Sequence, residues 1–154
     1  MIDEPQIVQS DQKPAAVIHL VIPRKEMMKE FGPAVHELIA VMEAQGSAPA
    51  GPVFAHHFKI TPDQFDFEVG FPVKKPITES GRVKPGELPA AKVVRTEYRG
   101  PYEGLPAAWK EFSSWVKSND LNPRSDIWEV YVAGPELGPD PTTYRTELNW
   151  PLVS

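Results

Sequence analysis

The segment DIWEVYV, residues 126–132, places one carboxylate, Glu129, in a run that otherwise favours a covered β-strand. A charge in apolar surroundings costs several kcal/mol unless a partner or water compensates it. Two kinds of chemistry use such a group. Beside aromatic rings it attracts a lipophilic cation through Coulomb and cation–π contacts. With its pKa raised by partial desolvation, it could instead act as a general acid or base.

Strand alternation predicts which side chains share a face with this carboxylate. Glu129 and Tyr131 are two residues apart and point to the same side. On the last strand-like stretch, the side chain of Glu147 points away from the side that its apolar neighbours share. We expect Glu129 and Glu147 to face the same space. In the first half of the chain Ala55 matches Glu129 and His57 matches Tyr131. The sequence therefore predicts an asymmetric site with one acidic wall.

Hydrophobic periodicity predicts the elements that position these residues. Apolar residues at three- and four-residue intervals indicate amphipathic helices over 24–45 and 103–118. Strand-like stretches precede each helix, at 15–23 and 91–98. Two more follow each helix, at 51–60 and 65–73 in the first half and at 126–132 and 143–152 in the second. The pattern β-α-β-β thus occurs twice, which argues for duplication of one unit.

The duplication predicts an α+β fold. One unit of three short strands cannot bury its helix, whereas two units can. We expect an antiparallel sheet with two helices packed on one face and a ligand cleft on the other. The expected domain plan is an N-terminal tail (1–14) and a single domain (15–154). That domain divides into repeat one (15–73), a linker (74–90) and repeat two (91–153).

Composition narrows the classes of function. The chain has no cysteine, and its net charge of −5 disfavours direct nucleic-acid binding. The N-terminus lacks the features of a signal peptide, and no apolar run approaches the roughly 18 residues of a membrane span. We therefore expect a cytoplasmic protein without membrane contact. Adjacent strand residues such as His56 and His57 point to opposite faces, so no metal site is expected, and no cofactor motif appears.

Several motifs resemble a known family. The stretch EYRGPYEGLPAAWKEFSSWVKSNDL, followed by WEVYV and TELNWPL, closely resembles the GyrI-like small-molecule-binding domain. This domain is also the effector-binding domain of AraC-type and MerR-type bacterial transcription regulators. GPVFAHHFKITPDQFDFEVGFPV resembles its N-terminal repeat. The resemblance covers about residues 15–153 and rests on the ordered combination of motifs.

The resemblance implies a tandem β-α-β-β fold with a central cleft for hydrophobic, often cationic, drug-like molecules. By motif match, the key buried glutamate is Glu129, with Glu147 as a candidate second acid. Tyr131 and Tyr102 become candidate wall or hydrogen-bonding groups. The first repeat departs from many relatives, because His57 stands in a His-His pair where they carry a tyrosine.

Each candidate also has a structural interpretation. Glu129 could be a solvent-facing strand residue, and Glu147 could serve a structural hydrogen bond kept by the repeat. Trp109 is predicted to be a core residue of the second helix, with one ring edge available to the cleft. Tyr102 follows a Gly-Pro turn and could act as a hydrophobic staple.

Three functions remain open on the sequence. The first is a stand-alone bacterial module that binds a small hydrophobic or cationic molecule, to sequester or sense it. The second is a hydrolase of electrophilic, cyclopropane-type natural products that uses Glu129 and Tyr131. The third is a gyrase-inhibitor-like module that acts on a protein partner such as gyrase or a regulator. The first demands least of the sequence.

Overall fold

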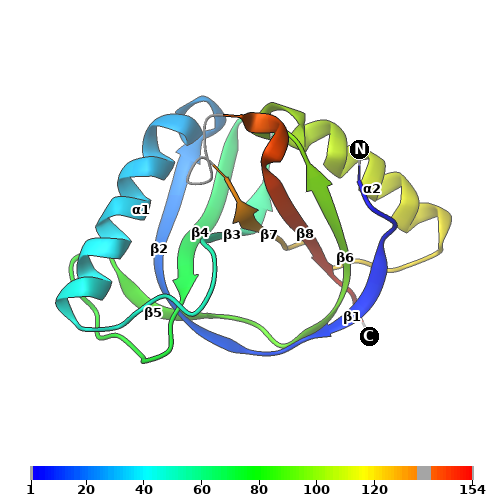
Figure 1. The fold of residues 1–154 in the computed structure, drawn as a ribbon. Helices are drawn as coiled ribbons and strands as arrows, with labels where there is room; N and C mark the ends of the chain where they lie inside the picture. The colour runs from blue at the N-terminus through cyan, green and yellow to red at the C-terminus, as the bar shows by residue number, and fades with distance from the viewer. Residues whose placement is uncertain (1, 135–139, 154) are drawn as a thin grey trace. The chain divides into compact units, whose positions relative to one another are not determined.

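The computed structural model describes residues 2–134 and 140–153, and also omits the side chains of Met28 and Ile60. The chain divides into two compact units. Unit 1 comprises Met1–Ser10 and Ala91–Ser154, and unit 2 comprises Asp11–Ala90. Figure 1 colours the chain in sequence order, so in unit 1 the blue strand at the N-terminus is seen beside a green strand from the second half of the chain.

Unit 1 is an antiparallel sheet covered by one long helix. Its strands lie in the order β1-β6-β8-β7. Its elements are β1 (Gln6–Ser10), β6 (Ala91–Arg99), η2 (Tyr102–Gly104), α2 (Leu105–Ser118), β7 (Ile127–Ala133), η4 (Pro141–Thr143) and β8 (Arg145–Pro151). The helix follows the amphipathic pattern of the sequence, since its buried residues Ala108, Phe112 and Val116 recur every four positions.

Unit 2 repeats the arrangement. Its strands lie in the order β5-β2-β4-β3, again antiparallel. Its elements are β2 (Lys13–Pro23), η1 (Arg24–Glu26), α1 (Met27–Ala44), β3 (Phe54–Ile60), β4 (Gln64–Pro72) and β5 (Lys84–Leu88). The helix α1 packs against β2 and β4. Its buried residues Ala34, Leu38 and Met42 have the spacing of those in α2, as a duplication requires.

These elements confirm the predicted α+β class and the tandem β-α-β-β order. Even an irregularity is repeated. The register shifts between His57 and Lys59 in β3, and between Tyr131 and Ala133 in β7. His57 and Tyr131 are the residues that the sequence comparison matched. A β-bulge redirects the side chains that follow it, so its conservation between the repeats indicates a common origin of the two strands.

Two strands were missed by the sequence analysis. Residues 6–10, assigned to an N-terminal tail, form β1 and pair with β6. Residues 84–88, assigned to a linker, form β5 and pair with β2. Both strands are short and rich in Gln, Pro or Gly, so they carry little strand propensity of their own. Pairing with a longer neighbour determines their conformation.

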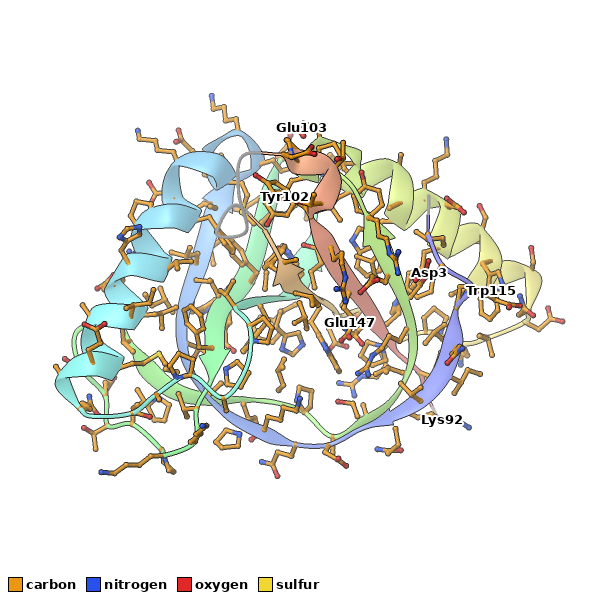
Figure 2. All side chains as sticks on the ribbon, in the orientation of Figure 1. Asp3, Lys92, Tyr102, Glu103, Trp115 and Glu147 are labelled. Atoms are coloured by element: carbon orange, nitrogen blue, oxygen red, sulfur yellow. The ribbon has the colours of Figure 1, made fainter. Side chains whose placement is uncertain are left out.

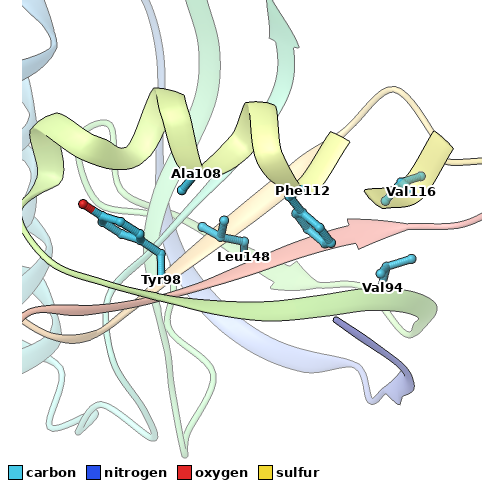
Figure 3. Packing of buried hydrophobic residues seen from close by; sticks show 6 residues of the cluster. All are labelled: Val94, Tyr98, Ala108, Phe112, Val116 and Leu148. Carbon is cyan, nitrogen blue, oxygen red and sulfur yellow. The ribbon is translucent and has the colours of Figure 1, made fainter. Parts of the chain in front are cut away.

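The core of unit 1 lies between α2 and the strands β6 and β8. Phe112 and Val116 of the helix meet Val94, Tyr98 and Leu148 of the two strands, as Figure 3 shows. Phe112, Val94 and Leu148 are fully buried. Burying one such large side chain contributes about 1.5–3 kcal/mol to folding. This packing fixes the position of α2 over its own sheet, and with it the position of the side chains at the edge of the helix.

The apolar residues whose spacing predicts a helix over 24–45 include Leu38, Ile39 and Met42, and the buried face of α1 follows them only in part. Leu38 and Met42 are buried as expected, but Ile39 remains 39% exposed and Ala34 takes a buried position. Ala34, Leu38 and Met42 are four residues apart, so the buried face of the helix runs through Ala34 and leaves Ile39 beside it. Among the described residues, no helix is both long and apolar enough to cross a membrane.

The Gly-Pro-Tyr segment before α2 is held by a tyrosine. The Tyr98 hydroxyl donates a 2.9 Å hydrogen bond to the Pro101 carbonyl. Gly100 has a φ of +140°, a conformation that a side chain would strain. A Cβ on Gly104 would lie 2.0 Å from the Tyr98 hydroxyl oxygen. The two glycines of the motif therefore leave room for the tyrosine, and this arrangement positions Tyr102 between them.

We expect Gly104→Ala to lower the free energy of unfolding by about 1–3 kcal/mol, because the added methyl group displaces the Tyr98 hydroxyl and breaks its hydrogen bond. Chemical denaturation followed by tryptophan fluorescence measures the change. Gly32→Ala is the comparison: apart from its chain neighbours, nothing lies within 4 Å of a Cβ built on Gly32 in α1. The gain in helix propensity is opposed by Pro33, which disfavours a helical residue with a Cβ before it, so this change should alter stability far less than Gly104→Ala. Equal effects of the two substitutions would contradict this account of the motif.

Candidate functional site

Glu129 lies on the face of the unit 1 sheet that α2 covers. Its register partner on β8 is Leu148, which belongs to the core beneath α2. Its side chain is buried, with 7% of its surface exposed. The residue thus combines a strand position at the edge of the helix with a carboxylate removed from water.

Two neutral donors hold the carboxylate. The indole Nε1 of Trp109 donates to Glu129 Oε2 at 2.6 Å. The Tyr131 hydroxyl donates to Glu129 Oε1 at 2.6 Å. The helix supplies the first donor and the strand itself supplies the second, two residues along the same face. Each carboxylate oxygen therefore has a short hydrogen bond from an uncharged aromatic residue.

Burial dominates the protonation of this pair. The pKa of Glu129 is raised above its ordinary value, because desolvation outweighs the opposing effect of the hydrogen bonds from Tyr131 and Trp109. The pKa of Tyr131 is raised well above its usual range, first by burial and then by the adjacent Glu129. Tyr131 therefore stays protonated and continues to donate at neutral pH.

Aromatic rings extend from this pair. The rings of Tyr102 and Tyr131 meet edge to face with centroids 5.8 Å apart, and Tyr144 lies 5.1 Å from Tyr102. Trp109 continues toward the core through an edge contact with Trp150 at 6.1 Å. The three tyrosine residues are half-buried as whole residues, although the hydroxyl of Tyr131 is removed from water. Sites of this kind, with an apolar wall and one charge, suit hydrophobic ligands.

Four of the six predicted site residues come together in unit 1. Glu129, Tyr131 and Trp109 are joined by hydrogen bonds, and Tyr102 touches the Tyr131 ring. The role of Trp109 is larger than predicted, because its indole N–H contacts the carboxylate directly. No sequence spacing indicates that bond, since it joins a helix to a strand 20 residues away.

The expected position of Glu147 is wrong. Its register partners are Val130 and Glu97, so it faces the side of the sheet opposite to Glu129. It lies 3.4 Å from Arg95 Nε and accepts a 3.1 Å hydrogen bond from Asn149. Figure 2 labels Glu147 on β8 and Tyr102 in η2, just before α2. Alternation correctly predicted which residues of one strand share a face. Which residues of two neighbouring strands share a face depends on the pairing register.

His57 belongs to unit 2 and has its own aromatic surroundings. Its ring stacks on Phe67 at 5.1 Å and meets the edge of Phe65 at 5.3 Å. Burial, with smaller effects of His56 and Arg24, lowers its pKa to about 4. Its Nδ1 finds no hydrogen-bond partner among the described residues. His57 is therefore a neutral ring at pH 7, packed between two phenylalanines.

Sequence reasoning missed two residues beside the carboxylate. Tyr144 contributes the third ring of the tyrosine group. Thr146 lies opposite Tyr131 across the strands, is fully buried, and has no partner for its hydroxyl in the described part of the chain. Alternation on the last strand places both residues on the face of Leu148. The register with β7 was needed to recognise that this is also the face of Glu129.

Comparison with known proteins agrees with this arrangement. The family model for the GyrI-like small molecule binding domain matches residues 3–153. The chain belongs to this family. No curated protein sequence matches it significantly.

Solved structures show the same fold for this GyrI-like domain at low sequence identity. The EcmrR C-terminal domain has 18% identity and a TM-score of 0.86, with 98% of each chain covered. A complex of EcmrR with DNA has 20% identity and a TM-score of 0.85, and the match spans 97% of this chain but only 57% of that one.

Two further structures carry functional descriptions of their own. SAV2435, solved with bound tetraphenylphosphonium, has 12% identity and a TM-score of 0.72, covering 99% of this chain and 95% of SAV2435. A hydrolase from Listeria innocua has 14% identity and a TM-score of 0.68, covering 97% and 91%. At these identities the likeness concerns the fold.

The raised pKa of Glu129 predicts a pH dependence of stability. The folded state holds this proton more tightly than the unfolded chain, so the contribution of Glu129 to stability is greatest at low pH and falls as the pH rises through its folded pKa. We expect wild type to lose stability relative to Glu129→Gln as the pH rises above 4.5, the ordinary value for this carboxyl group. Urea denaturation of both proteins across this range measures the difference. A constant difference would contradict a desolvated carboxylate.

His57 predicts the opposite trend. Its folded pKa, about 4, lies below the ordinary value of 6.5, so stability is lost as the pH falls from 6.5 toward 4. We expect His57→Phe to remove this loss, which approaches about 3 kcal/mol over the window. The exposed His36 of α1 provides a control, since His36→Gln should leave the acid sensitivity in place. Denaturation series at several pH values decide the matter, and unchanged sensitivity in His57→Phe would refute a buried neutral ring.

Proposed function

We propose that this GyrI-like domain binds a hydrophobic, cationic organic molecule at Glu129, in order to sequester or sense it. The observation that carries the proposal is the pairing of a buried carboxylate with neutral donors alone. In residues 2–134 and 140–153, no lysine, arginine or histidine forms an ion pair with Glu129. A cationic ligand would supply the missing charge.

The surrounding rings favour the same class of ligand. Tyr102, Tyr131 and Tyr144 offer half-buried aromatic surface next to the carboxylate. A cation against such rings gains about 0.5–2 kcal/mol beyond its attraction to the carboxylate. A lipophilic cation also loses little hydration on entering a ring-lined site, whereas a small hydrated ion loses much. SAV2435, which has a similar fold, was solved with bound tetraphenylphosphonium, a lipophilic cation, and this supports the proposal.

A second candidate is hydrolysis of an electrophilic natural product. The raised pKa of Glu129 suits a general acid or base, and Tyr131 could orient the same carboxylate or donate to a leaving group. The fold likeness to a protein described as a hydrolase is consistent with this second candidate.

Both candidate functions place the protein in the cytoplasm. The sequence has no cysteine, and the described residues include no helix that could span a membrane, which is consistent with that location.

Titration calorimetry with tetraphenylphosphonium tests the binding proposal. We expect Glu129→Gln to weaken binding of this cation by about 1–3 kcal/mol, roughly 5- to 150-fold, because the ligand loses its charged partner. Triphenylphosphine oxide, a neutral compound of similar shape, should bind both proteins equally. Glu111→Gln on the exposed side of α2 removes the same charge away from the site and should leave both affinities unchanged.

The outcomes separate the candidates. Equal affinity of the cation for wild type and Glu129→Gln would contradict cation binding at this carboxylate. Conversion of an electrophilic compound by wild type but not by Glu129→Gln, at unchanged affinity for the neutral substrate, would establish the hydrolase instead. Product analysis by mass spectrometry makes that distinction.

A further inference from the structure

The two outermost strands of the units are equivalent in the repeat but differ in chemistry. β1 and β5 each end shortly before the first long strand of a repeat, and each is the last strand in the order of its unit. The residues of β1 are QIVQS, and those of β5 are KPGEL. Ile7 occupies the position of Pro85, and Gln9 that of Glu87. An outer strand offers unpaired backbone groups to another strand, so these differences bear on association.

Hydrogen bonding in unit 1 shows which groups of β1 face outward. The carbonyl of Lys92 accepts a 2.9 Å bond from the Leu152 N–H, on the β8 side of β6. Alternate residues of a strand direct their peptide groups to opposite sides, so Val93 turns its groups toward β1. There its register partner is Val8. The neighbours of Val8, Ile7 and Gln9, consequently direct their N–H and C=O groups away from β6.

The equivalent outward positions of β5 are protected. Pro85 has no N–H to offer, and Glu87 places a charge on the edge. Proline and charged residues at such positions are recognised means of preventing strand addition. The β1 edge has neither device: Ile7 and Gln9 are uncharged, and Ile7 is an apolar side chain that is 45% exposed. Strand addition is therefore disfavoured at the β5 edge, and no such device opposes it at the β1 edge.

We propose that the β1 edge binds a second copy of this chain. Antiparallel pairing about a two-fold axis at Val8 places Ile7 opposite Gln9 of the partner subunit, and Gln9 opposite the partner's Ile7. These two pairs present outward peptide groups to each other and form four backbone hydrogen bonds. Val8 meets the partner's Val8 in the close central pair. No charged residue lies within Gln6–Ser10, so the chain's net charge of −5 is not concentrated at this contact.

The short strand makes the dimer a reversible one. Five residues bury far less than the roughly 1,200–2,000 Å² of a stable interface. The β5 strand suggests the test. The double substitution Ile7→Pro/Gln9→Glu gives β1 the two outward-facing residue types of β5, proline and glutamate. The proline removes only an outward N–H, so pairing with β6 is retained.

Sedimentation equilibrium of the full chain over a wide concentration range measures the association. We expect a monomer–dimer equilibrium in wild type, weakened at least tenfold in the Ile7→Pro/Gln9→Glu variant with unchanged circular dichroism. Hydrogen exchange gives a second readout: the amides of Ile7 and Gln9 should become protected at high concentration, while Val8 is protected at all concentrations. A monomeric wild type at every concentration, or a dimer that the variant leaves intact, would overturn the proposal.

Discussion

The proposed binding site depends on the free energy of one buried carboxylate. Glu129 sits on a strand, next to a helix, with its oxygens held by an indole and a phenol. Neutral donors reduce the cost of desolvating the charge but do not cancel it, since the pKa of Glu129 remains raised. A carboxylate that is desolvated but hydrogen-bonded is stabilised further in its ionised form by a positive charge nearby, which is why we propose a cationic ligand. An arginine of the protein paired with Glu129 would neutralise the carboxylate and remove its attraction for a cationic ligand.

Packing near Glu129 holds its donors and the surrounding rings in place. Phe112, Val94 and Leu148 fix α2 on its sheet, and Trp109 stands one residue after a buried alanine of the same helix. The Tyr98 hydroxyl orders the segment that carries Tyr102. The donors and rings around Glu129 are thereby positioned by contacts that do not involve the carboxylate. Such support from a rigid neighbourhood is what a preformed binding site requires.

The sequence predicted much of this architecture because its signals are local. Apolar spacing located both helices, and alternation located six strands and the faces within each. β1 and β5 escaped detection because their residues carry little strand propensity and depend on pairing. The relation between Glu129 and Glu147 was also beyond a local signal: register, a long-range property, turned them to opposite faces. The bond from Trp109 to Glu129 joins two elements whose contact only the packed helix creates.

We propose that Glu129 is a desolvated carboxylate that binds a cationic ligand. Carbon-13 NMR of its carboxyl group, assigned through the Glu129→Gln variant, measures its pKa directly with and without tetraphenylphosphonium. We expect a raised pKa of Glu129 in the free protein and a lower pKa when the cation is bound, because a positive charge stabilises the ionised form. A pKa that the cation leaves unchanged, or an ordinary value in the free protein, would contradict it.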